Sequence, residues 1–144
     1  MKATMLLKRQ HREVEKLFST ALKNDDAKTR RDAMRKIVRA LQHHTAIEEK
    51  IFYPAVRELG TKKAEEMVGE AYEEHHVVKL VLAELPGLDP SAENFDAKMT
   101  VLKELVEHHV EEEEQEMFPM AERRLGQEQS AELAQRMEGS AEAA

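Results

Sequence analysis

Two short segments of the sequence place histidine and glutamate side chains at a spacing that could bind a metal ion. One segment, "HTAIEEKIFYP", runs from His44 to Pro54, and the other, "HVEEEEQEMFP", runs from His109 to Pro119. Both follow the pattern H-x-x-x-E-E-x-x-x-x-P, so the histidine and the first glutamate stand four positions apart. In a helix this separation puts both side chains on one face. An imidazole and a carboxylate placed in this way could bind the same iron, manganese or zinc ion.

The spacing has this meaning only in a helix, and the composition predicts a helical chain. Ala, Glu, Lys, Leu, Arg and Met are abundant and are strong helix formers. Only five Gly and four Pro occur among the 144 residues. Gly and Pro residues, and the segment "LKNDDAKT" at 22–29, delimit four long helices and one short helix, which we expect at about 3–23, 28–58, 61–85, 91–124 and 127–138.

Four long helices joined by short loops favour an all-α fold, an up-down-up-down four-helix bundle. We expect residues 1–125 to form this bundle and residues 126–144 to form a short C-terminal helix with a frayed tail. Gly60 suits the position after the end of the second helix, and Thr61 suits the N-cap of the third.

Each long helix has an apolar stripe at helical spacing, and polar side chains interrupt every stripe. His11 lies between Leu7 and Val14 in the first helix, and His75 has the equivalent place in the third. The other two stripes run through the His–Glu pairs. A buried carboxylate must be paired, protonated or bound to metal, because an isolated buried charge is very costly. The side chains predicted to share one cation-binding core are His11, His44, Glu48, His75, His109 and Glu113.

The pattern indicates a duplicated helical hairpin, in which each copy supplies one lone histidine and one His–Glu pair. Among the four consecutive glutamates of the second copy, Glu113 alone shares the inward face with His109. We expect Glu111 and Glu114 to be largely solvated and Glu112 to lie near the boundary.

Composition and charge exclude several other classes of protein. The formal net charge is −7 and there is no long basic run, so nucleic acid and anionic membranes are poor candidate partners. There are no cysteines, which excludes disulfides, iron–sulfur clusters and thiolate zinc sites. The short apolar run near the N-terminus is broken by Lys8 and Arg9, so we expect neither a signal peptide nor a segment able to span a bilayer. We expect a cytoplasmic protein, either a monomer or a weak homodimer.

Other interpretations of these residues remain open. Either His–Glu pair alone would more often be a surface pair, and it is the duplication that favours metal. His43 and His108 fall off the stripes and are expected to be exposed. His76 could be a surface residue, a neighbour of the site or a metal ligand. Tyr53 could be a core residue, a hydrogen-bond partner of the site or a phenolate ligand.

The chain resembles the hemerythrin-like (HHE cation-binding) family, as a single-domain, bacterial-type member. The resemblance rests on His11 and on the segments "HHTAIEEKIFYP", "EEHHVV" and "HHVEEEEQEMFP", and it covers about residues 5–122. It implies a four-helix bundle that holds two iron ions with an oxo or hydroxo bridge. It also implies terminal histidine ligands and bridging carboxylates, here His11, His44, His75 and His109, with Glu48 and Glu113.

The chain departs from the oxygen-carrying members of that family, which place two histidines one turn apart on the third helix. The positions one turn before and after His75 are Ala71 and Lys79. A smaller set of ligands leaves an exchangeable position, so we expect a non-haem di-iron protein that binds or reduces O2, peroxide or NO. Catalase-like or peroxidase-like chemistry is favoured over reversible O2 carriage.

The alternatives are an iron-binding sensor or storage protein and a simple O2 carrier. A ferritin-like oxidase ranks low because that class needs two Glu-x-x-His motifs, and the chain offers one candidate, Glu73 to His76. A purely structural bundle would leave the inward carboxylates unexplained.

Overall fold

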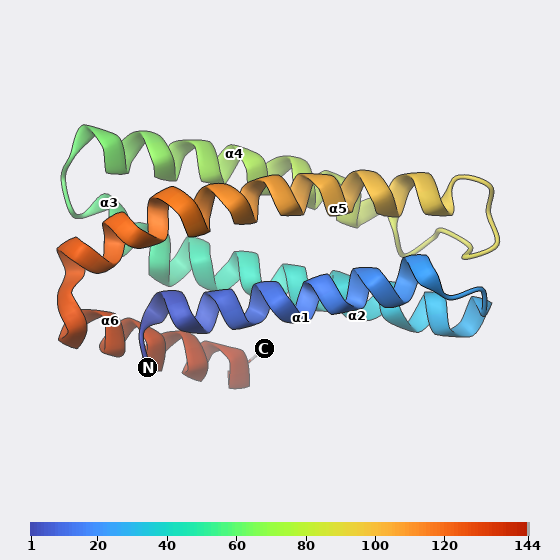
Figure 1. Ribbon diagram of the computed structural model, residues 1–144, viewed down its shortest axis with the longest axis horizontal. Helices are drawn as coiled ribbons and strands as arrows, with labels where there is room; N and C mark the ends of the chain where they lie inside the picture. Colours follow the sequence, from blue (N-terminus) through green and yellow to red (C-terminus); the bar gives the residue numbers. More distant parts are fainter. Residues whose placement is uncertain (144) are drawn as a thin grey trace.

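The computed structural model describes residues 1–143, and the side chains of residues 1–140. Four long helices lie side by side along the molecule, and successive helices run in opposite directions (Figure 1). The helices in chain order are α1 (Ala3–Lys23), α2 (Ala27–Ile47), α3 (Tyr53–Arg57), α4 (Lys62–Glu84), α5 (Phe95–Glu112) and α6 (Phe118–Ala143). The predicted all-α, up-down-up-down bundle is confirmed. Within the described residues, no helix is both long and apolar enough to cross a membrane.

Two stretches expected to be uninterrupted α-helix each contain one π-helical turn. These turns are η1 (Glu48–Phe52) and η2 (Glu113–Met117), and each begins at the first glutamate of an H-x-x-x-E-E motif. The amide of Tyr53 donates to the carbonyl of Glu48, five residues back, and the amide of Phe118 likewise donates to Glu113. The next residue in each segment is a proline, which has no amide hydrogen to donate. In the wider π-turn the helix continues without a backbone hydrogen bond from that position. Such π-turns occur frequently at functional sites.

Local sequence signals explain where the helices begin and end. The Thr61 hydroxyl accepts a hydrogen bond from the Ala64 amide at 3.1 Å, and Gly60 has a φ of 76°, as the sequence predicts. The helix expected from about residue 91 begins instead at Phe95. Consecutive hydrogen-bonded turns occupy residues 89–95, so the chain turns twice before α5 starts.

The core consists of two apolar clusters separated by a polar layer. One cluster, near the loop between α4 and α5, includes Phe18, Ile37 and Phe95. The other, near α3, includes Phe52 and Phe118. All five of these side chains are at most 2% exposed. The inward histidines and glutamates lie between the clusters, so apolar packing on both sides holds them away from water.

The C-terminal segment packs on the bundle. Gly126 has a φ of 81°, a conformation that suits glycine, and here α6 turns back beneath α1 (Figure 1). Its buried side chains include Leu133 and Met137, and the Ser130 hydroxyl accepts a hydrogen bond from the Ala3 amide at 2.8 Å. The sequence predicted a shorter helix and a frayed tail, whereas helix continues to Ala143. The last residue of that predicted tail, 144, lies outside the described residues.

Candidate metal centre

The six side chains predicted from the interrupted stripes converge in the polar layer. Each is at most 6% exposed, and together they come from all four long helices and the two π-turns. They form two overlapping groups of potential ligands. The members of the first group are His11, His44, Glu48 and Glu113, and those of the second are Glu48, His75 and His109.

The first group brings two imidazoles against two carboxylates. The Nε2 atoms of His11 and His44 are 3.2 Å apart. His11 Nε2 lies 3.2 Å from Glu113 Oε1, and His44 Nε2 lies 3.2 Å from Glu48 Oε1. Four donor atoms so close together, in a space closed to solvent, form the arrangement expected of ligands around one cation.

The second group has the same form, with a phenol added. The Nε2 atoms of His75 and His109 are 3.1 Å apart, and His75 Nε2 lies 3.1 Å from Glu48 Oε1. The Tyr53 hydroxyl lies 3.1 Å from both of these nitrogens. It also donates a hydrogen bond to Glu113 Oε2 at 2.6 Å. Tyr53 therefore reaches into the centre rather than only filling the core, and its oxygen lies where a ligand to the second ion could lie.

The two glutamates connect the groups. Glu48 belongs to both, while Glu113 directs Oε1 toward His11 and Oε2 toward Tyr53. Among the described residues, Glu48 Oε2 and Glu113 Oε1 are buried without a hydrogen-bond partner. A buried carboxylate oxygen normally has a partner, so these two atoms fit direct contact with cations. The residues present thus suit two metal ions bridged by carboxylates.

A second layer of hydrogen bonds orients all four histidines. Each Nδ1 lies 2.6–2.7 Å from a side-chain oxygen. The pairs are His11 with Glu114, His44 with Gln10, His75 with Glu49, and His109 with Glu74. With an oxygen acceptor at Nδ1, that nitrogen carries the hydrogen and Nε2 keeps its lone pair for a metal.

This second layer corrects one expectation and adds residues that the sequence analysis missed. Glu114 was expected to be largely solvated, but its side chain is 18% exposed and bonds to His11. The signal was the second glutamate of the repeated E-E, since Glu49 has the equivalent place beside His75. Gln10 and Glu74 share another signal, because each directly precedes a lone histidine.

The other histidines lie outside the centre. His76 and His108 are exposed, whereas His43 is half-buried rather than exposed as predicted. His76 is therefore not brought to the ligand cluster. Lys79, one turn after His75, also points away from the centre. Its side chain is 50% exposed, and its Nζ lies 2.8 Å from Glu49 Oε2.

Burial and close contact between ionisable groups shift the pKa values of several residues in the centre. Burial opposes ionisation of Glu48, but its electrostatic interaction with His44 and the surrounding hydrogen bonds hold the pKa of Glu48 well below its usual value. Burial likewise opposes the charged forms of His11 and His109, yet Glu113 and neighbouring carboxylates raise the pKa of both. Burial, followed by the charges of Glu113 and Glu48, raises the pKa of Tyr53 well above 10. Cations would neutralise the same carboxylates.

Replacing Glu114 with alanine is expected to weaken metal binding by about tenfold, the lower end of the range for lost partners of metal-bound histidines. The substitution leaves His11 Nδ1 without its acceptor and also removes an ion pair with Arg12. Competition titration with a chelator would measure the affinity. The control is Glu111→Ala, because Glu111 is exposed on the same helix. Equal effects of the two substitutions would contradict the orienting role of Glu114.

The fold and the site together define a helical-bundle metal-binding protein whose His/Glu cluster fits a di-iron centre. The family model "Hemerythrin HHE cation binding domain" matches residues 3–121. The chain therefore belongs to the hemerythrin HHE cation-binding family, and the resemblance noted in the sequence is confirmed.

Similar proteins include two curated sequences and one solved structure. The chain is 27% identical over 129 residues to a protein named DNA nickase from a Nostoc strain, with 90% of this chain and 36% of that protein aligned. It is also 27% identical over 128 residues to an uncharacterized hemerythrin-like protein of Schizosaccharomyces pombe, with 89% and 63% aligned. The chain thus spans about one third and just under two thirds of these relatives.

The crystal structure of a hemerythrin HHE cation-binding domain-containing protein from Mycobacterium kansasii superposes with a TM-score of 0.79. The two chains are 24% identical, and the match covers 97% of this chain and 87% of the other. At this identity the likeness supports the shared bundle fold.

Proposed function

We propose that this protein holds two iron ions, joined by an oxo or hydroxo bridge, and decomposes hydrogen peroxide in a catalase-like reaction. The observation that carries the proposal is the Tyr53 hydroxyl, 3.1 Å from the Nε2 atoms of both His75 and His109. This half of the centre has two histidines and a phenol rather than a third imidazole. A phenol is a weak ligand with a transferable proton, so this half suits exchange and proton transfer more than durable O2 binding.

The donor set is compatible with iron, and the family resemblance is what selects iron for this proposal. Imidazole nitrogen and carboxylate oxygen suit iron, manganese and zinc. Two carboxylates, Glu48 and Glu113, can offset the charge of two cations at once. The family's description as cation-binding agrees with this donor set. Metal analysis of protein purified without added metal would test the choice of ion.

An apolar pocket beside the four histidines limits the oxidant to a small molecule. The pocket has a volume of about 20 Å³, about the room that one water-sized molecule needs. Its apolar walls include Val14, Leu41, Val78 and Val106. Such walls favour uncharged species like O2 and hydrogen peroxide over anions, and the volume suits a molecule of that size.

The proposed reaction is balanced without another reductant. Two molecules of hydrogen peroxide give two of water and one of O2, because one peroxide loses two electrons and two protons and the other gains them. Bound iron would supply the two-electron exchange. The chain contributes the proton path, because the Tyr53 hydroxyl can give a proton and the adjoining Glu113 carboxylate can receive one. The histidines, oriented through Nδ1, keep the centre rigid while protons move.

Oxygen release from peroxide would test this function. Apo protein is reconstituted anaerobically with Fe²⁺, freed of excess metal, exposed to air and mixed with hydrogen peroxide over an oxygen electrode. We expect rapid O2 evolution in proportion to protein-bound iron, with apo protein plus the same free iron as the control. A long-lived coloured O2 adduct with no O2 evolution from peroxide would instead support carriage and refute the catalase-like proposal.

A further inference from the structure

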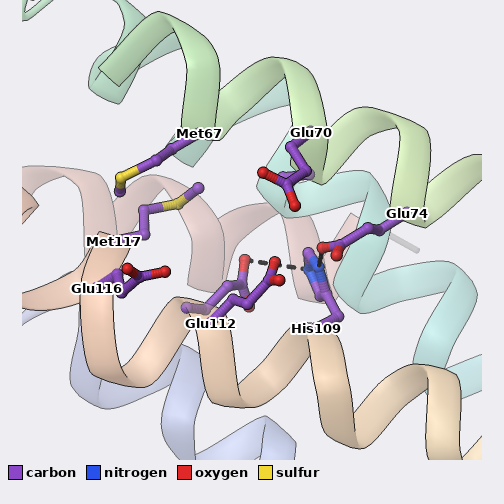
Figure 2. A pocket seen from close by; sticks show the side chains of 9 residues that line it. Met67, Glu70, Glu74, His109, Glu112, Glu116 and Met117 are labelled. Atoms are coloured by element: carbon purple, nitrogen blue, oxygen red, sulfur yellow. Dashed lines mark hydrogen bonds and ion pairs between the residues drawn. The ribbon is translucent and has the colours of Figure 1, made fainter. Parts of the chain in front are cut away.

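A second pocket approaches the centre from a different side, and its lining is acidic. It lies between α4 and the helix formed by α5 and η2, with a volume of about 30 Å³. Glu70 and Glu74 extend from α4 toward Glu112 and His109 on the facing helix, and Glu116 lies one turn further along (Figure 2). The apolar pocket reaches the same histidine through Val78 and Val106 instead. The centre thus has one apolar approach and one acidic approach.

The outer part of the acidic pocket contains a three-residue group with the geometry of cation ligands. Glu74, His108 and Glu112 each present one ligand atom within 4.8 Å of the others. His108 Nε2 lies 2.8 Å from Glu112 Oε1 and 3.6 Å from Glu74 Oε2. This outer group comes from two helices, and His108 is 66% exposed, so a hydrated ion can reach it directly.

The inner end of the pocket is formed by residues of the metal centre. His109 and Glu113 both line it. Glu113 is 1% exposed, and its Oε1 atom is buried without a hydrogen-bond partner among the described residues. Glu74 connects the two ends, because its Oε1 lies 2.6 Å from His109 Nδ1 while its Oε2 faces His108. Polar side chains therefore continue from the exposed outer group to Glu113, whose Oε1 faces His11 in the first ligand group.

The charges of the pocket suit a cation. Within residues 1–140, no lysine or arginine forms an ion pair with Glu70, Glu74, Glu112 or Glu116, and the partners of Glu74 and Glu112 are histidines. A divalent ion must exchange its water for protein ligands as it enters, because an unpaired charge in an apolar passage is very costly. Carboxylate groups provide that exchange from the exposed end of this pocket inward, whereas no carboxylate is among the described residues that line the apolar pocket.

We propose that the acidic pocket is the path by which divalent metal ions reach the buried centre, and that Glu74, His108 and Glu112 form an outer site that receives the ion first. This inference rests on the proposed two-metal centre. It assigns separate approaches to the metal ions and to the oxidant. Clefts lined by one sign of charge raise association rates tenfold or more, so the outer site should affect the rate of metal uptake and leave the capacity unchanged.

Stopped-flow uptake of Co²⁺ by apo protein tests the path, because Co²⁺ in a histidine–carboxylate site has visible absorption. The double variant His108→Ala/Glu112→Gln is expected to take up Co²⁺ about tenfold more slowly at low salt. Its final spectrum and its capacity of two ions are expected to match the wild type. Added salt should lower the rate of Co²⁺ uptake by the wild type more than the rate of uptake by the variant. Glu74 is left intact because it also contacts His109.

The matched control is His76→Ala/Glu104→Gln, which makes the same chemical changes at exposed positions outside the pocket. Uptake at the wild-type rate in the His108/Glu112 variant, or equal slowing in the control, would overturn the proposed path while leaving the two-metal centre in place. Loss of bound Co²⁺ at equilibrium in the test variant would also overturn it, since the outer residues would then belong to the centre itself. If the wild type bound no Co²⁺, that result would refute the two-metal centre on which the proposed path rests.

Discussion

Replacing Glu48 with glutamine is expected to abolish binding of both metal ions. Glu48 belongs to both ligand groups and is fully buried. Glutamine has a similar shape but carries no negative charge, so neither ion would keep its shared carboxylate. Metal analysis after reconstitution and desalting should find about two ions per wild-type chain and almost none in the variant.

The same variant should lose the stabilisation that metal provides. A ligand present at a thousand times its Kd contributes about 4 kcal/mol to the free energy of unfolding. For a chain of this size, that corresponds to a rise in Tm of about 10 °C. A chelator should therefore lower the Tm of the wild type by about this amount and leave that of Glu48→Gln unchanged.

Metal-free Glu48→Gln should be less stable than metal-free wild type at neutral pH, because the lowered pKa of Glu48 means that the fold stabilises its charged form. The control is Glu111→Gln, which removes one charge at an exposed position and should keep both ions and the full effect of the chelator. Two bound ions in Glu48→Gln would show that Glu48 does not bridge them.

The bundle and the buried cluster of histidines and glutamates were predictable because each depends on a periodic signal. A buried helix face needs apolar side chains at helical spacing, so histidines and glutamates within such a stripe are conspicuous. The stripes alone were enough to place His11 and His75 in the core. The repeated motif was a second reason to place Glu48 and Glu113 there.

Hydrogen bonds between helices were harder to predict because they depend on rotation and distance rather than on periodicity. Glu114 lies about 100° around the helix from Glu113 and so was placed in solvent. The π-turn that begins at Glu113 changes the rotation of the following residues, and Glu114 reaches His11 on another helix. The proline six residues after the first glutamate of each motif was visible in the sequence, and it marks both turns.

Replacing Tyr53 with phenylalanine is expected to lower peroxide turnover by about 100-fold, the lower end of the contribution of a positioned proton donor. The substitution keeps the aromatic packing and removes one hydroxyl, which donates to Glu113 at 2.6 Å and is fully buried. Reduction of one peroxide to two waters consumes the two protons that the other peroxide releases, and the bonded Tyr53–Glu113 pair lies where it can pass them on. Oxygen evolution per bound iron is the measurement.

The control is Tyr72→Phe, because the Tyr72 hydroxyl donates to the backbone carbonyl of Glu49 and lies outside the ligand groups. It should retain both the metal and the activity of the wild type. Full turnover in Tyr53→Phe would exclude the proton-donor role. Loss of iron from Tyr53→Phe would contradict that role too, because the hydroxyl would then be a required ligand. The proton-donor role therefore requires that Tyr53→Phe turn over peroxide more slowly while it still binds two ions.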